Sequence, residues 1–141
     1  MLNLTKKTDY ALMAINFIAS QGTGVANTRT ISEIYNIPLP LLAKILQRLT
    51  KYNIITSYGG PKGGYMLGRL PSQITIAEVI RAIEGPIHIT RCCEGEIMCS
   101  QFERCSVHGP LQKIEAKIIA MLNGITVDEM YSEHFEELLV V

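Results

Sequence analysis

The chain has 141 residues, of which 48% are hydrophobic and 18% are charged. This length suits one domain with a modest core, and the composition excludes a disordered chain. No apolar run reaches the roughly 20 residues that a membrane-spanning helix needs, and Asp9 and Asn16 interrupt the first apolar stretch, which argues against a secretory signal. We therefore expect a cytoplasmic protein whose thiols are kept reduced.

Charge is distributed unevenly along the chain, although the net charge is zero. Residues 1–91 hold 10 Lys and Arg against 4 acidic residues, whereas residues 92–141 hold 3 against 9. A basic half suits a polyanionic partner, and an acidic half often faces solvent or another subunit. Solvated charges that separated by chance are the alternative explanation.

Two helices are predicted before residue 37. The first covers about residues 8–21, and its helical periodicity points one face inward, formed by Ala11, Ala14, Ile15 and Ile18. Thr30 and Glu33 predict a capping box for a short second helix. That helix should end near Asn36, because Pro38 and Pro40 disfavour helical backbone before them.

A third helix is predicted from about residue 39 to residue 52, and it has two distinct faces. One face is apolar and consists of Leu42, Ile45, Leu46 and Leu49. The other is basic and polar and consists of Lys44, Gln47, Arg48 and Lys51.

A β-hairpin is predicted at "IITSYGGPKGGYML", residues 54–67, with Lys62 at or near its tip. The Gly-rich loop is not a phosphate loop, since it lacks the required spacing and lies between strands. The segment "TIAEVIRAIEG" then predicts a helix with Thr75 and Glu78 as its capping box and Gly85 as its end.

A last long helix is predicted to open at Pro110. Its apolar residues recur at alternating intervals of 3 and 4 residues, the pattern of a short coiled-coil seam. Such a seam needs a partner helix, which predicts a homodimer that forms through Leu111, Ile114, Ile118, Met121 and Ile125.

The order of three helices followed by a hairpin is that of a winged helix-turn-helix, a mainly α fold with a small β-wing. In this architecture the third helix enters the major groove of DNA and the wing lies beside it. A protein-binding module and a merely solvated helix face are the alternatives. The predicted DNA contacts are Thr30, Pro40, Leu41, Lys44, Gln47, Arg48, Lys51, Tyr58 and Lys62.

All four cysteines lie between residues 92 and 105, and three of them form the pattern CxxxxxCxxxxxCxxH with His108. Thiolates with one histidine suit an iron-sulfur cluster, and they also suit a tetrahedral structural zinc site. The gaps are longer than those usual for zinc. Spacing alone does not decide between an iron-sulfur cluster and a zinc site. Cys92 adjoins Cys93, and adjacent side chains point apart, so we expect Cys92 to be a buried or idle thiol.

The segments "LTKKTDYAL", "YGGPKGGYML" and "TIAEVIRAIEG", followed by the spaced cysteines, resemble the IscR and NsrR family of bacterial iron-sulfur transcription regulators. The resemblance covers residues 1 to about 131 and is nearest to the IscR branch. It implies a homodimeric repressor or dual regulator that dimerises through the long helix. A redox-labile cluster near the dimer interface would then control operator affinity.

The resemblance implies two rival fourth ligands. The IscR branch holds a 2Fe-2S cluster with three cysteines and one histidine, which correspond here to Cys93, Cys99, Cys105 and His108. The NsrR branch carries an aspartate, here Asp9, which ligates a 4Fe-4S cluster from the partner subunit. His88 and His134 lie outside the pattern and are expected to be ordinary surface or packed residues.

Two positions depart from the family pattern. Members often place an arginine before the first glycine of the wing, where this chain has Tyr58, and some have a glutamate where this chain has Ala43. The operator sequence therefore cannot be carried over from the family.

The expected organisation is a DNA-binding domain at 1–84, a cluster loop at 85–109, a dimerisation helix with a short following helix at 110–131, and a tail at 132–141. The expected function is control of iron-sulfur assembly genes through cluster availability. A sensor of nitric oxide or redox stress and a zinc-stabilised interaction module are the alternatives. We do not expect an enzyme, because a thiol oxidoreductase would need CxxC beside a βαβ unit.

Overall fold

Helix α1 (Lys6–Ser20) is the element against which most of the other helices pack. In the computed structural model, which describes residues 3–89, 100 and 102–132, α1 contacts α2, α3, α4 and β2. Its buried face contains the predicted Ala11, Ala14, Ile15 and Ile18. The helix begins after Thr5, whose side chain accepts a hydrogen bond from the Thr8 amide.

Helix α2 (Thr28–Tyr35) begins earlier than predicted. Its N-cap is Asn27, whose side-chain oxygen accepts a hydrogen bond from the Arg29 amide at 2.8 Å. The predicted capping box of Thr30 and Glu33 is therefore wrong, because asparagine is among the strongest N-caps and starts the helix upstream. The helix ends as predicted at Asn36, which is left-handed with φ 52°.

Helix α3 (Leu39–Lys51) follows at once and matches the predicted range closely. Its predicted apolar face is buried in the core, namely Leu42, Ile45, Leu46 and Leu49. Burial of this face turns the opposite side of α3 toward solvent.

The predicted hairpin is confirmed as strands β1 (Ile55–Tyr58) and β2 (Gly64–Leu67), which pair antiparallel with Ile55 opposite Leu67. The wing is attached to the connection between α1 and α2. Ala26 and Tyr65 exchange two backbone hydrogen bonds, both of 2.8 Å. Gly64 is required there, because a Cβ at this position would overlap the Ala26 carbonyl group.

A short 3-10 turn η1 (Pro71–Gln73) leads into helix α4 (Ile76–Glu84). The predicted capping box is present, since the Thr75 hydroxyl accepts from the Glu78 amide and the Glu78 carboxylate accepts from the Thr75 amide. Glu78 also forms an ion pair with Arg69, with 3.1 Å between Oε1 and Nη1. The helix ends as predicted at Gly85, with φ 84°.

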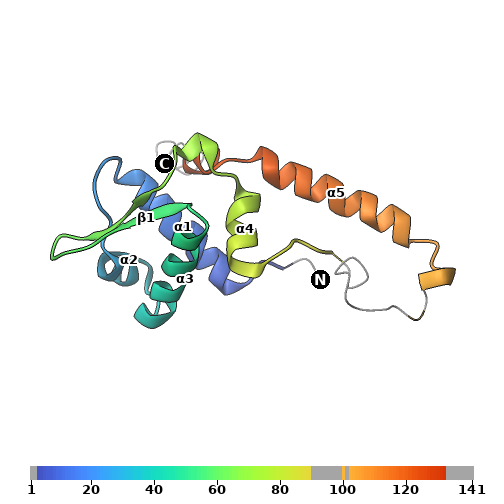
Figure 1. Ribbon diagram of the computed structural model, residues 1–141, viewed down its shortest axis with the longest axis horizontal. Coiled ribbons are helices and arrows are strands. Elements are labelled where there is room, and N and C mark those ends of the chain that lie inside the picture. Colours follow the sequence, from blue (N-terminus) through green and yellow to red (C-terminus); the bar gives the residue numbers. More distant parts are fainter. Residues whose placement is uncertain (1–2, 90–99, 101, 133–141) are drawn as a thin grey trace, which may run out of the picture.

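A second short turn, η3 (Phe102–Arg104), precedes helix α5 (His108–Gly124), which extends as an arm away from the helical body (Figure 1). The helix begins two residues before Pro110, and no residue within it is fully buried. Its C-terminal end is attached to the body, because Ile76 donates to the Ile125 carbonyl and Val127 donates to the Ile74 carbonyl, each at 2.9 Å. Val127 lies in the core.

Within the residues that the structure describes, no helix combines the length and the hydrophobicity needed to cross a lipid bilayer.

Candidate nucleic-acid interface and metal-ligand loop

The solvent side of α3 carries most of the predicted DNA contacts. Pro40, Lys44, Gln47, Arg48 and Lys51 are exposed along α3, and Thr30 is exposed on α2. Leu41 is the exception, because it is half-buried and packs against the core. On the wing, Tyr58 and Lys62 are both exposed.

An open groove of about 670 Å³ runs between the first turn of α3, the start of α2 and the wing. The predicted DNA contacts leave out several residues that line it, namely Asn27, Arg29 and Leu39, and also Ala43, which the sequence singled out only as a departure from the family pattern. The helical register could have found two of these, since Ala43 and Leu39 precede Gln47 by one and two helical turns. The groove brings Tyr58 of the wing together with the start of α3, as a winged helix-turn-helix requires.

Arg48 has a structural partner as well as an exposed position. Its Nε donates a hydrogen bond of 2.9 Å to the Ala82 carbonyl in the last turn of α4. A cation is favourable at the C-terminal end of a helix, where carbonyl groups point outward. Arg48 therefore ties α3 to α4, while a guanidinium retains further donors for another partner.

Two of the predicted metal ligands lie within the described residues. Cys105 and His108 are both half-buried and stand at the point where the chain enters α5, with His108 as its first residue. Sulfur and imidazole nitrogen are suitable donors for an iron-sulfur cluster and also for zinc. Cys92, Cys93, Cys99 and His134 lie outside the described residues, and within the described part no group of three or more potential ligands is assembled.

Asp9, the rival ligand, lies in the first turn of α1 and is half-buried. Helix α1 belongs to the helical body, whereas the first residues of α5 lie at the far end of the arm (Figure 1). One chain therefore does not bring Asp9 beside His108. An Asp9 ligand to a cluster held by Cys105 would therefore come from a second chain.

Glu115 on α5 holds the segment that leads from α4 toward the cysteines. Its Oε2 accepts a hydrogen bond of 3.0 Å from the Ile89 amide, and its Oε1 lies 3.3 Å from His88 Nδ1. The Glu115 side chain is only 13% exposed. His88, predicted to be an ordinary surface or packed residue, is half-buried and takes part in this contact.

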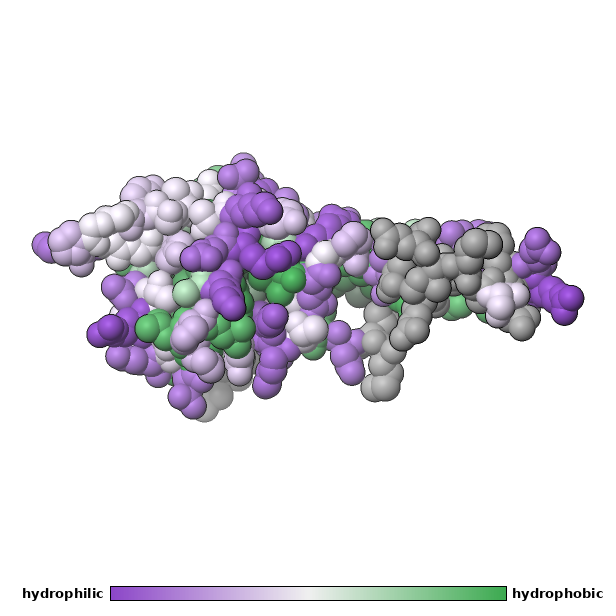
Figure 2. All heavy atoms as spheres, turned by 60° about the horizontal axis from the view of Figure 1, so that its bottom comes forward, coloured by the Kyte–Doolittle hydropathy of each residue, from purple (hydrophilic) through white to green (hydrophobic). Residues whose placement is uncertain are grey.

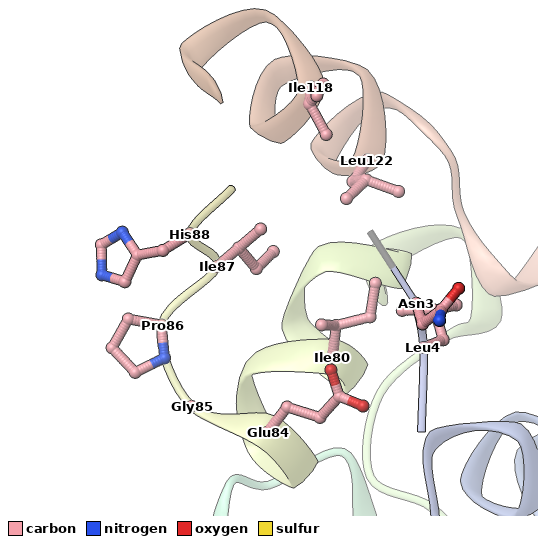
Figure 3. A pocket seen from close by; sticks show the side chains of 10 residues that line it. All are labelled: Asn3, Leu4, Ile80, Glu84, Gly85, Pro86, Ile87, His88, Ile118 and Leu122. Carbon is pink, nitrogen blue, oxygen red and sulfur yellow. The ribbon is translucent and has the colours of Figure 1, made fainter. Parts of the chain in front are cut away.

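A partly open, mainly apolar pocket of about 280 Å³ lies at the joint between body and arm. Figure 3 shows Ile118 and Leu122 of α5 directed toward Ile80 of α4, with Ile87 at the side. Ile118 is thus directed toward the chain's own α4, whereas Ile114 and Met121 of the predicted seam are exposed.

Three packed helices, a β-wing attached to them, and a solvent-facing basic side on α3 define a DNA-binding transcription regulator of the winged helix-turn-helix class. Comparison with protein families makes the assignment specific. The chain belongs to the Rrf2 family of iron-dependent transcriptional regulators, whose family model matches residues 4–133.

Individual relatives support the assignment. The HTH-type transcriptional regulator IscR of Sodalis glossinidius is 36% identical over 141 residues, which cover 99% of this chain and 84% of that protein. Among solved structures, CymR, the global cysteine regulator of B. subtilis, has a TM-score of 0.75 at 25% identity and covers 94% of this chain and 98% of its own. IscR of T. potens has a TM-score of 0.71 at 25% identity, with 94% and 88% covered.

Proposed function

We propose that this regulator acts as a homodimer whose operator affinity is controlled by an iron-sulfur cluster, and that it regulates genes for iron-sulfur cluster assembly. The observation that carries the proposal is the placement of Cys105 just before α5 and of His108 as its first residue, on a chain that also has a winged helix-turn-helix. The similarity to regulators named IscR supports it.

The proposed cluster ligands are Cys93, Cys99, Cys105 and His108, and the proposed cluster is of the 2Fe-2S type. The cluster would supply a redox-labile group whose presence reports iron and sulfur supply. The protein's own contribution is the attachment of the loop. Glu115 holds the segment before the cysteines, and the backbone of α5 continues directly from His108.

The proposed DNA contacts divide into two kinds. Lys44, Lys51 and Lys62 would neutralise phosphates, which contributes salt-dependent affinity. Gln47 and residues near the first turn of α3 would face base edges in the major groove. Arg48 would donate its remaining N–H groups to DNA phosphates, while its Nε keeps the hydrogen bond to the Ala82 carbonyl.

Titration of a fluorescent duplex at several salt concentrations tests the DNA-binding proposal. Affinity should fall steeply with salt, and Lys44→Ala or Lys62→Ala should weaken binding and reduce the salt slope by about one each. Lys113→Ala, on the arm, is the matched control and should leave the slope unchanged. An affinity that does not change with salt, or a salt slope that changes equally in all three variants, would refute the proposed interface.

The homodimer proposal rests on exposed apolar residues of α5. Ile114 is 47% exposed and Met121 is 58% exposed, although both belong to the 3,4-spaced seam. A stripe of this kind is unfavourable in water and suits a second copy of the same helix. Leu111 and Ile125 continue the stripe toward its two ends.

Light scattering of the Met121→Asp variant tests the dimer. The wild type should be dimeric at micromolar concentration, and the variant should be monomeric because a charge in the seam cannot be desolvated. Leu70→Asp is the control, since Leu70 is exposed outside α5 and its replacement should leave the dimer intact. A monomeric wild type, or a dimeric Met121→Asp variant, would exclude the seam as the interface.

A further inference from the structure

The first turn of α3 presents apolar side chains to the groove beside the wing. Leu39 and Ala43 are four residues apart, so they lie on the same side of the helix, and both line the groove. Neither belongs to the buried core face of α3. Leu39 is 41% exposed, so its side chain is accessible from the groove.

Polar and cationic groups surround these two side chains. Asn27 and Arg29 line the groove from α2, and Ser57 and Tyr58 line it from the wing. Lys44 follows Ala43 on the exposed side of α3. Figure 2 shows apolar side chains interleaved with hydrophilic ones on the helical body beside the wing. A polar border that includes the Arg29 cation, with an apolar strip inside it, suits a base edge flanked by phosphates.

Base-edge chemistry decides which sequence would suit this strip. Leu39 and Ala43 carry no side-chain donor or acceptor, so they cannot recognise guanine, cytosine or adenine by hydrogen bonds. The thymine 5-methyl group is the apolar feature of an unmodified base pair in the major groove. Aliphatic side chains at the start of a recognition helix are complementary to it.

We propose that Leu39 and Ala43 recognise thymine methyl groups in the major groove and thereby place A·T pairs opposite the first turn of α3 in the operator. This inference rests on the proposed DNA contacts and adds the base class that they select.

Deoxyuridine substitution tests the inference without any change to the protein. Protein purified without oxygen is first used to select its binding sequence from random duplexes. Each thymine of the selected site is then replaced by deoxyuridine, which keeps base pairing and every hydrogen-bonding group and removes only the methyl. Affinity should fall about three- to fivefold for each methyl that faces α3.

The variant Leu39→Ala links the effect to this residue. It should weaken binding to the thymine duplex and have no effect on the duplex that lacks the facing methyl groups. Leu70→Ala, at an exposed leucine that does not line the groove, should affect neither duplex. Two outcomes overturn this inference and leave the proposed DNA contacts standing. One is sequence-selective binding whose affinity does not change with deoxyuridine, and the other is a loss of affinity in Leu39→Ala that is equal on both duplexes. If the selection recovers no duplex that the protein binds, the proposed DNA contacts are overturned instead.

Discussion

Arg48 Nε donates a hydrogen bond of 2.9 Å to the Ala82 carbonyl and so joins α3 to the last turn of α4. Arg48→Ala should lower the free energy of unfolding by about 1 kcal/mol, the usual net contribution of one hydrogen bond. It should also weaken DNA binding, because α3 loses a support and the interface loses a cation. Denaturant unfolding and DNA titration measure the two effects separately.

Arg48→Lys separates charge from geometry. Lysine keeps the cation near DNA but lacks the planar guanidinium that reaches the carbonyl with Nε. The lysine variant should therefore lose stability and keep part of its DNA affinity. If both variants keep the wild-type free energy of unfolding, the hydrogen bond from Arg48 to the Ala82 carbonyl contributes nothing to stability.

Glu84 should make stability depend on acidic pH. Partial burial raises the pKa of Glu84, but hydrogen bonds from the Thr5 amide and the Thr8 hydroxyl to Oε1 outweigh it and lower the pKa below its ordinary value of 4.5. A carboxyl with a lowered folded-state pKa adds stability above its ordinary pKa, and this stability is lost as the pH falls through the folded value. Glu84→Gln should therefore destabilise the protein at neutral pH and have a smaller effect near pH 3.

Unfolding of both proteins by urea across this pH range measures the difference. Glu78 also has a lowered pKa; burial raises it, but hydrogen bonds from Thr75 and Arg69 outweigh this. Because Glu78 is present in both proteins, its contribution cancels. Glu103→Gln, at an exposed residue, is the control and should leave the pH profile close to that of the wild type. If Glu84→Gln lowers the free energy of unfolding by the same amount at all pH values, the lowered pKa of Glu84 does not contribute to stability as proposed.

Gly64→Ala should detach the wing from the body. A Cβ at residue 64 would overlap the Ala26 carbonyl, which accepts the Tyr65 amide, so the backbone must shift at a cost of about 1–3 kcal/mol. Gly59→Ala is the matched control, since a Cβ there has no atom within 4 Å. Hydrogen exchange at the Tyr65 amide should accelerate only in the Gly64 variant, and equal exchange in both variants would count against a rigid attachment.

Capping motifs and helical periodicity predicted those parts of the fold that depend on residues close together in the sequence. The capping box of Thr75 and Glu78 and the inward face that contains Ile15 follow from spacing along one helix. The same kind of pattern failed at Thr30 and Glu33, because Asn27 offers a competing start three residues earlier. Sequence spacing alone does not say which of two adequate caps the helix will use.

Contacts between distant segments could not be predicted in this way. The hydrogen bond from Arg48 spans 34 residues, and the one between Ile89 and Glu115 spans 26. Each depends on how segments far apart in the chain pack against each other, which periodicity does not determine. For the same reason, the sequence indicated a basic face on α3 but missed that Leu39 and Ala43 face a groove completed by the wing.

Glu115→Ala should release the segment that enters the cysteine loop. Glu115 is mostly buried and accepts the Ile89 amide, so its removal should cost about 1–2 kcal/mol and leave that amide open to exchange. Glu115→Gln keeps an acceptor at the same place and should retain most of the protection. Hydrogen exchange at Ile89 should therefore rise in the alanine variant, while amides of α1 and α3 stay protected. Unchanged exchange at Ile89 would show that Glu115 does not hold the segment.

The rival fourth ligands, His108 and Asp9, should separate in Mössbauer spectra of protein purified without oxygen. His108 is the better candidate because it lies three residues after Cys105, at the point where the chain enters α5, whereas Asp9 lies on α1 in the helical body. Asp9→Ala should leave a 2Fe-2S spectrum unchanged. His108→Ala should lose the cluster or make it labile, and His108→Cys should retain one with a lower potential, since thiolate ligation favours the oxidised form. Glu103→Ala controls for general disturbance of the turn before α5 and should match the wild type. A 4Fe-4S spectrum that survives His108→Ala and disappears in Asp9→Ala would reverse the assignment, require a ligand from the second chain, and favour nitric-oxide sensing over control of cluster assembly.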